Sequence, residues 1–169
     1  MKYSLEIFKS KKYPVFTFKD IKQLKIPKNY AKQLMYNKIK RGEVKRIKKG
    51  YYTFHEDPMI VVFAYEPAYL GLESALSIHK VWDQKTVPVI ITQKNVRQGI
   101  RKFNNTNYVV KRIAPSLFTD YTTINYYGFW LPVSTLEKTY EDIKYFNEKI
   151  DPKTMRKLKK LIKKNKLKK

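Results

Sequence analysis

The sequence predicts an α+β protein, and three observations support this class. The chain has 169 residues, of which 43% are hydrophobic and 15% aromatic, so it can build a core and is not a disordered protein. Segments with helical periodicity alternate with β-branched runs, and turn residues separate them. Charge also divides the chain, which predicts a basic N-terminal domain (1–56), an α+β domain (57–150) and a basic C-terminal tail or helix (151–169).

The formal net charge of +23 is concentrated at the two ends of the chain. Residues 1–56 carry 16 Lys and Arg against 4 Asp and Glu, and residues 151–169 carry 10 against 1. Residues 57–150 carry 11 against 9. Two basic ends around an ordinary middle favour contact with a polyanion, such as nucleic acid, over a surface adapted only for solubility or a lysine-rich proteome.

The sequence disfavours disulfide-bonded, thiolate metal-binding, secreted and membrane-spanning proteins. There is no cysteine, which excludes a disulfide framework and a thiolate metal site. The N-terminal stretch MKYSLEIFKSKK lacks the apolar run of a signal peptide, and no stretch approaches the ~18 apolar residues of a membrane span. We therefore expect a soluble, cytoplasmic protein that does not bind membranes.

The first domain is predicted to contain three helices. SLEIFKSKK is expected to form a short helix with Ser4 as its N-cap. Thr17 followed by Asp20 is a weaker form of the capping box and opens a second short helix. Pro27 suits the start of the third helix, and Gly42 suits its end. The strands EVKRIKK and YYTFH then form a hairpin, and this order predicts a winged helix-turn-helix domain.

The third helix has the composition of a DNA-recognition helix. At 100° per residue its apolar residues Ala31, Leu34, Met35 and Ile39 share one face. Its remaining surface carries groups that suit base edges or phosphates, and the whole helix lacks acidic residues. The alternative is an ordinary solvated face, which would more often carry Glu. The predicted contacts to double-stranded DNA from this helix are Lys28, Asn29, Lys32, Gln33, Tyr36, Asn37 and Lys40.

The hairpin that follows has the composition of a basic wing. We expect Val44, Ile47, Tyr52 and Phe54 to hold it against the helices. Its basic side chains would then lie along the phosphate backbone or enter the minor groove. The predicted wing contacts are Arg41, Lys45, Arg46, Lys48 and Lys49.

The second domain is predicted to be a small α+β domain with a mostly antiparallel sheet. Asp57 and Pro58 suit a helix start, although PMIVVFAYE also reads as a buried strand. GIRKF and YVVKRIA flank the turn sequence NNTN and predict a hairpin. Ser134 and Glu137 have the spacing of a full capping box at the start of a helix.

Catalytic and metal-binding patterns were not found in the sequence. His79 follows Ser74 on one predicted helix, which is not the arrangement of a catalytic triad, and a structural role is favoured for His79 and His55. The two histidines do not have the spacing of a metal site, and no Gly-rich phosphate loop occurs. We therefore expect a protein that is not an enzyme and needs no cofactor.

The basic tail allows three interpretations. Asp151 can cap a helix that starts at Pro152, with Met155, Leu158, Leu161 and Ile162 on one side. These apolar residues could dock on the second domain. The tail could instead be a nonspecific nucleic-acid arm or, less favoured, a helix on a membrane surface.

Four segments of the chain, in order, resemble the AbiEi-type antitoxins of type IV toxin–antitoxin systems. LMYNKIKRGEVKRIKKGYYTF resembles the family's helix and wing, in which a hydrophobic helix ends in Gly and a basic strand leads to Gly-x-Tyr. AYLGLESALSIHKVW, VPVIITQK and LPVSTLEKTYEDIKYF resemble its later strands and helices. The resemblance covers about residues 15–150, and the basic tail after residue 151 departs from the family pattern.

This resemblance implies an antitoxin that represses its own operon and counteracts a nucleotidyltransferase-like toxin without forming a stable complex with it. Two other functions stay open. One is a general nucleic-acid-binding protein, associated with chromatin or RNA, that lacks sequence specificity. The other is a protein-interaction module in which residues 57–150 hold a partner. The sequence leaves the operator, the toxin and the oligomeric state undetermined.

Overall fold

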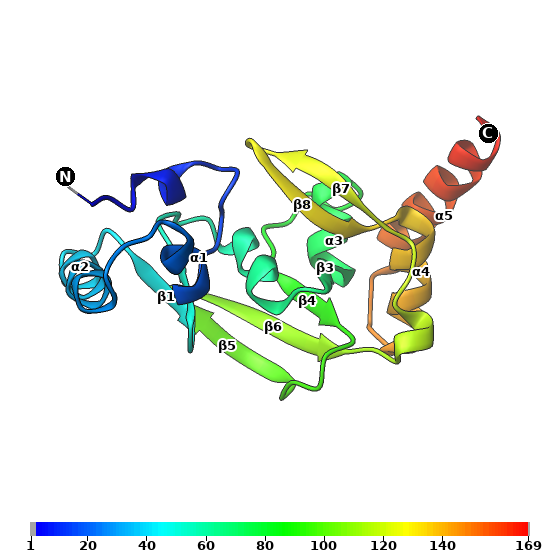
Figure 1. Ribbon diagram of the computed structural model, residues 1–169. Helices are drawn as coiled ribbons and strands as arrows, with labels where there is room; N and C mark the ends of the chain where they lie inside the picture. The colour runs from blue at the N-terminus through cyan, green and yellow to red at the C-terminus, as the bar shows by residue number, and fades with distance from the viewer. Residues whose placement is uncertain (1–2, 169) are drawn as a thin grey trace.

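A small helical unit closed by a two-stranded hairpin forms the N-terminal part of the protein (Figure 1). The computed structural model describes residues 3–168. The elements of this unit are η1 (Glu6–Lys9), α1 (Phe18–Gln23), α2 (Lys28–Lys40), β1 (Lys45–Lys48) and β2 (Tyr51–Thr53). In addition, Phe16 forms an isolated antiparallel bridge with Tyr52 of β2. The chain between η1 and α1 therefore joins the hairpin as a third, one-residue strand.

Local signals set the limits of these helices, with one exception. The Asp20 carboxylate accepts hydrogen bonds from the backbone N–H and hydroxyl of Thr17, at 2.6 and 2.8 Å, and so fixes the start of α1. Gly42 follows α2 with φ of +72°, a conformation that glycine adopts readily. The helix predicted to begin at Ser4 is only the four-residue 3₁₀ helix η1. Its Phe8 stacks on Phe16 with the ring centroids 4.5 Å apart, so tertiary packing of this ring holds a short turn here.

The rest of the chain builds one six-stranded sheet with helices around it. The strand order is β5-β6-β4-β3-β8-β7. Three antiparallel pairings and two parallel ones, β3 with β8 and β4 with β6, make the sheet mixed, with antiparallel pairing in the majority as predicted. Its elements are η2 (Pro58–Tyr65), β3 (Ala68–Leu70), α3 (Leu72–Ile78), β4 (Val89–Thr92), β5 (Gly99–Phe103), β6 (Thr106–Arg112), η3 (Pro115–Leu117), β7 (Tyr121–Tyr126), β8 (Phe129–Ser134), α4 (Leu136–Tyr145) and α5 (Pro152–Lys166).

Of two helix starts in this part, one answers a question that the sequence left open and the other corrects a prediction. The segment after Asp57 is the 3₁₀ helix η2, and the Asp57 carboxylate accepts a hydrogen bond from the Met59 N–H at 2.9 Å. The predicted N-cap Ser134 is the last residue of β8, so Thr135 caps α4 instead. Ser134 is held in the strand because its hydroxyl lies 2.8 Å from that of Thr139 in the buried interior.

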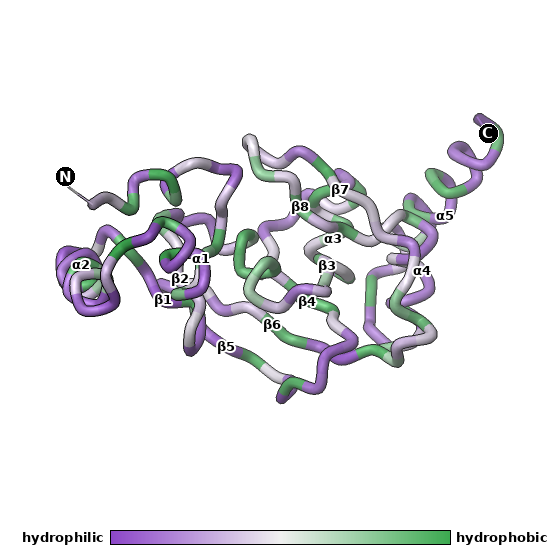
Figure 2. The backbone as a smooth tube through the Cα atoms, in the orientation of Figure 1, coloured by the Kyte–Doolittle hydropathy of each residue, from purple (hydrophilic) through white to green (hydrophobic). Residues whose placement is uncertain are grey.

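Hydrophobic cores cover both faces of the sheet. Adjacent strand residues alternate between them, so that Leu70 packs with η2 on one face while Tyr69 packs with the helices on the other. Helices α4 and α5 lie together at the end of the molecule opposite α2 (Figure 1). In Figure 2, the segments that cross the middle of the molecule are rich in hydrophobic positions, whereas α2 and α5 are largely hydrophilic.

One wing residue packs differently from the sequence prediction. Val44, Tyr52 and Phe54 contact the core of the N-terminal helices as expected. Ile47 instead joins the core of the sheet and η2, where its side chain is 6% exposed. The β1–β2 register shifts between Arg46 and Lys48, and an irregularity of this kind redirects side chains. The wing hairpin is therefore held from both sides, and residues 57–150 support its position.

Candidate nucleic-acid interface

The outward face of α2 presents most of the predicted recognition residues to solvent. Ala31 and Met35 are buried and anchor the helix on the N-terminal core. Opposite them, Tyr36 is 60% exposed, and its phenol ring extends from the surface. Asn37 is half-buried, and its side-chain oxygen accepts a hydrogen bond from Gln33 Nε2 at 3.2 Å. The exposed members of the predicted set are Lys28, Asn29, Lys32, Gln33, Tyr36 and Lys40.

The last turn of α2 departs from the predicted amphipathic pattern. Ile39 was placed on the buried face, but it is 42% exposed. On α2 the N-terminal hydrophobic cluster reaches Ala31, Leu34 and Met35, so the final turn lies beyond the residues that cover this helix. Ile39 thus adds an apolar position at the solvent-facing end of the candidate surface.

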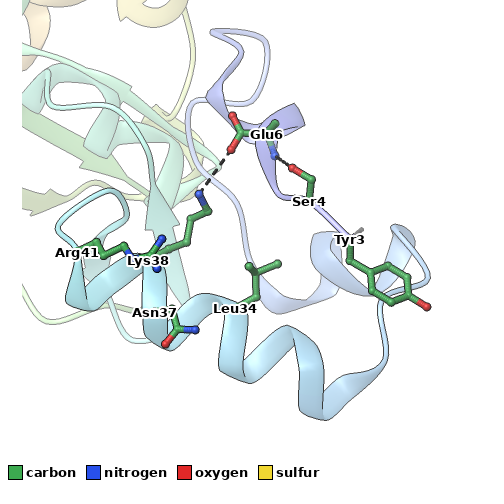
Figure 3. A pocket seen from close by; sticks show the side chains of 7 residues that line it. All are labelled: Tyr3, Ser4, Glu6, Leu34, Asn37, Lys38 and Arg41. Carbon is green, nitrogen blue, oxygen red and sulfur yellow. Dashed lines mark hydrogen bonds and ion pairs between the residues drawn. The ribbon is translucent and has the colours of Figure 1, made fainter. Parts of the chain in front are cut away.

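One flank of α2 is neutralised internally. Lys38 Nζ lies 2.6 Å from a Glu43 carboxylate oxygen and 3.5 Å from one of Glu6. The hydrogen bond with Glu43 is the main cause that raises the pKa of Lys38 above its ordinary value. Figure 3 shows Lys38 directed toward Glu6, across a hollow of about 510 Å³ between η1 and α2. This hollow is therefore a seam that joins η1 to α2, and Lys38 contributes little free charge to the outer face.

A second hollow separates α1 from α2 and carries a basic rim. Its volume is about 200 Å³, and its floor is apolar, with Ile21, Ile26 and Ala31 among the lining residues. Three lysines stand around it, and they are Lys22, Lys28 and Lys32. The sequence prediction did not include Lys22. The position of Lys22 in the last turn of α1, just before the inter-helix turn, is the signal that could have identified it.

Only part of the predicted wing is free to contact a ligand. Arg41, Arg46 and Lys49 are exposed. Lys45 is ion-paired with Glu56 at 2.9 Å, with only 22% of its side chain exposed. Lys48 Nζ lies 4.1 Å from the centre of the Tyr65 ring and 4.5 Å from that of Tyr51. The structure therefore gives Lys45 and Lys48 partners within the protein, in contrast to the predicted outward-facing role.

Two basic residues from outside the N-terminal unit, Lys94 and Arg101, lie near Lys48 of the hairpin, and the sequence prediction missed them. Burial lowers the pKa of Lys48, and the neighbouring charges of Lys94 and Arg101 lower this pKa further. Arg101 Nη2 donates a hydrogen bond to the Arg97 carbonyl at 2.6 Å, which fixes the guanidinium near the wing. Lys94 and Arg101 lie more than 40 positions from Lys48 in the sequence. Only the docking of the wing on the sheet brings these charges together.

The basic tail is an ordered helix in the described structure. The Asp151 carboxylate accepts a hydrogen bond from the Thr154 N–H at 2.9 Å and caps α5, as predicted. Leu158 is completely buried, and Met155, Leu161 and Ile162 pack beside it on the helix-covered face of the sheet. The docking interpretation of the tail is therefore confirmed. Along residues 3–168, no helix combines the length and the apolar content that crossing a membrane requires.

Both histidines make contacts that explain them structurally. His79 Nε2 lies 2.7 Å from the Ser134 carbonyl and ties the end of α3 to β8. The His55 ring packs edge-on against Phe129, 5.0 Å between ring centroids, and burial lowers the pKa of His55. His55 Nε2 also lies 3.4 Å from the Ser10 carbonyl. His55 therefore links the end of the β1–β2 hairpin to Ser10, between η1 and α1, and to Phe129 of β8.

Comparison with protein-family models finds no match for this chain, and comparison with curated proteins finds none either. The surface described above therefore has to be interpreted from its own chemistry.

Proposed function

We propose that the protein is a DNA-binding transcription regulator whose N-terminal unit is a winged helix-turn-helix domain. The order of the elements supports this assignment. A helical turn (η1), a one-residue strand at Phe16, two helices (α1 and α2) and a hairpin (β1 and β2) follow one another, and the Phe16–Tyr52 bridge joins the strand to the hairpin. In such a domain α2 would enter the major groove, and the wing would lie along the flanking backbone.

The observation that carries the proposal is the outer face of α2. It is solvent-exposed and acid-free, and it mixes lysines with Asn29, Gln33 and Tyr36. Amide side chains can pair with adenine edges, while lysines and tyrosine hydroxyls suit phosphates and guanine. The helix starts after Pro27, whose side chain provides no cap, so the first-turn N–H groups can donate hydrogen bonds to a phosphate oxygen.

The antitoxin role is proposed from the order of the four resembling segments. In this role the protein represses its own operon and counteracts a nucleotidyltransferase-like toxin, with residues 57–150 needed for the second activity. A stable heterodimer with the toxin is not expected. The proposal predicts that cells lacking this protein tolerate a toxin gene from the same operon poorly, and that expression of the protein in trans restores growth.

A binding titration would test the regulator proposal most directly. The protein is titrated against the DNA upstream of its own gene and against a shuffled duplex of equal length, at two salt concentrations. Specific regulators prefer their sites by roughly 10³-fold or more, so a preference above about a hundredfold would support a regulator. Equal affinity for both duplexes that falls steeply with salt would overturn it.

The second candidate function is general nucleic-acid binding, and α5 is the observation that favours it. The outer surface of this helix is almost entirely Lys and Arg, which attract phosphates without reading bases. Equal affinity in the titration above, or a preference for RNA over the duplex, would select this function over the first.

A further inference from the structure

The two edges of the six-stranded sheet differ in how they are protected. Within residues 3–168, β5 and β7 are the terminal strands, and each pairs on one side only. Exposed strand edges invite pairing with other chains, and charged residues on the edge normally prevent it. β5 has the sequence GIRKF, and its Arg101 and Lys102 provide such charges. β7 has the sequence YTTINY and carries no charge or proline.

The sequence segment that contains β7 is also free of basic residues. Residues 113–137 contain no Lys or Arg, although the chain has 37 of them, and their only charged side chains are Asp120 and Glu137. Residues 50–79 also lack Lys and Arg, but all of them except Glu56, Glu66 and Pro67 are buried or half-buried. β7 and the turn that follows it are instead largely exposed, with Tyr127 76% exposed, and Trp130 is the one exposed residue of β8, at 62%. An uncharged, aromatic surface on a chain of net charge +23 requires an explanation.

The turn of the hairpin determines which backbone groups of β7 are free to pair. Tyr127 and Gly128 join the strands with φ of +49° and +90°, which fits a two-residue type I′ turn closed by the Tyr126–Phe129 pair. Hydrogen-bonded and non-bonded pairs alternate along an antiparallel ladder. The N–H and C=O groups of Tyr121, Thr123 and Asn125 therefore point away from β8. The side chains of these three residues are also exposed, on the face that carries Trp130.

We propose that β7 pairs antiparallel with β7 of a second copy of this chain. A two-fold axis at Thr123 pairs Thr123 with its own counterpart and Tyr121 with Asn125, so the three outward-facing residues match among themselves. Threonines placed opposite each other on such a ladder form a favourable cross-strand pair. The two sheets then form one continuous sheet, and isologous contacts of this kind close after two copies.

Charge selects a second copy over a different protein as the occupant. Two chains that each carry +23 repel one another least where few basic side chains meet, and β7 itself carries none. Two basic residues lie near it: Lys11, whose Nζ donates a hydrogen bond to the Tyr127 carbonyl at the turn, and Lys168, which lines a hollow together with Thr122. A partner attracted by the net charge would be acidic and would need basic contacts along the strand, which the residues of β7 do not offer. The surface lies outside the candidate nucleic-acid interface, so this proposal does not depend on DNA binding.

Sedimentation velocity of the full-length protein without DNA tests the proposal. We expect a concentration-dependent dimer whose dissociation constant falls as salt is raised, because ~1 M salt shortens the screening length to about 3 Å and removes the repulsion. Thr123→Lys places like charges opposite each other at the axis and should weaken the dimer at least about tenfold.

The matched control is Ile100→Lys on β5, at a position that is 73% exposed. It adds the same charge to the opposite edge and should leave the dimer unchanged. Asn125→Lys provides a second test variant, and circular dichroism shows whether each variant is folded. A wild-type chain that stays monomeric at all concentrations and salts would overturn the proposal. Equal effects of Thr123→Lys and Ile100→Lys would overturn it as well.

Discussion

Helices α2 and α5 are both rich in lysine, but they offer a partner different chemistry. They lie at opposite ends of the molecule (Figure 1). The exposed residues of α2 combine lysines with two amides, Asn29 and Gln33, and two phenols, Tyr30 and Tyr36. The exposed face of α5 has a single amide, Asn165, among eight Lys and Arg within Pro152–Lys166.

This difference shows why net charge alone is a poor guide to function. Ion pairs with phosphates give affinity that depends on salt and little on sequence, whereas side chains with directional hydrogen bonds discriminate between bases. By this criterion α2 can read a sequence, and α5 can only increase affinity. The following predictions test this division of roles.

The largest effect is expected from removing the buried anchor of α5. Leu158 is completely buried among the helices and the sheet, so Leu158→Ala should lower the free energy of unfolding by about 2–5 kcal/mol, measured by urea denaturation. Leu167→Ala is the control, because Leu167 is 88% exposed, and it should change stability by less than about 0.5 kcal/mol. If both variants are equally stable, α5 is not held by this core.

Substitutions on α2 should separate specific from nonspecific binding. Gln33→Ala should cost about 1–3 kcal/mol of binding to the upstream DNA, because a bidentate base contact is lost, and much less on a shuffled duplex. Tyr36→Ala should also affect the specific complex more. Asn165→Ala removes the exposed amide of α5 and should leave both affinities unchanged. Equal losses on both duplexes for Gln33→Ala and Tyr36→Ala would show that α2 is not a recognition helix.

Two lysines of α2 should differ in their contribution to the salt dependence of binding. Lys32 is exposed, and Lys32→Ala should reduce the slope of log affinity against log salt by about 0.9, as expected for one lost phosphate contact. Lys38 is held by Glu43 and Glu6, so Lys38→Ala should leave the slope nearly unchanged. Identical slopes for these two variants would contradict the assignment of the outer face.

The smallest effect is expected when acid protonates the N-cap of α5, with the uncharged start of α2 as the comparison. The hydrogen bond from the Thr154 hydroxyl is the main cause that lowers the pKa of Asp151, with the backbone N–H groups of Thr154 and Lys153 adding to it. The stabilisation from this cap is present above the unfolded-state pKa of about 3.9 and is lost as pH falls through the lower folded-state pKa.

The Thr154 amide resonance should report this loss in an NMR titration from neutral pH to acid. Asp151→Asn keeps an acceptor oxygen and should remove the response. The Ala31 amide serves as a reference because the N-cap of α2 is Pro27, which has no titrating side chain. A Thr154 amide that moves no further than that of Ala31 would show that Asp151 does not cap α5 in solution.

Features that depend on neighbouring residues were predictable from the sequence, whereas contacts between distant residues were not. The limits of α2, the β1–β2 hairpin and the cap of α5 were predicted because each depends on residues within a few positions of one another, such as Asp151 and Thr154. Most of the exposed set on α2 followed from helical periodicity, with Asn37 and Ile39 as the exceptions. The internal partners of Lys45 and Lys48 could not be predicted, because Glu56 and Tyr65 approach these lysines only in the folded chain.

The α+β class, the two basic ends, the acid-free helix α2 and the capped, amphipathic helix α5 could thus all be predicted from local sequence. Tertiary structure alone decided the mixed strand order, the burial of Ile47 on the sheet, and the position of Lys94 and Arg101 beside the wing. It also decided that the uncharged strand β7, and not an interior strand, lies at an edge of the sheet. Local hydrogen bonds and periodicity are encoded over short spans of sequence, whereas strand order depends on which distant segments exclude water together.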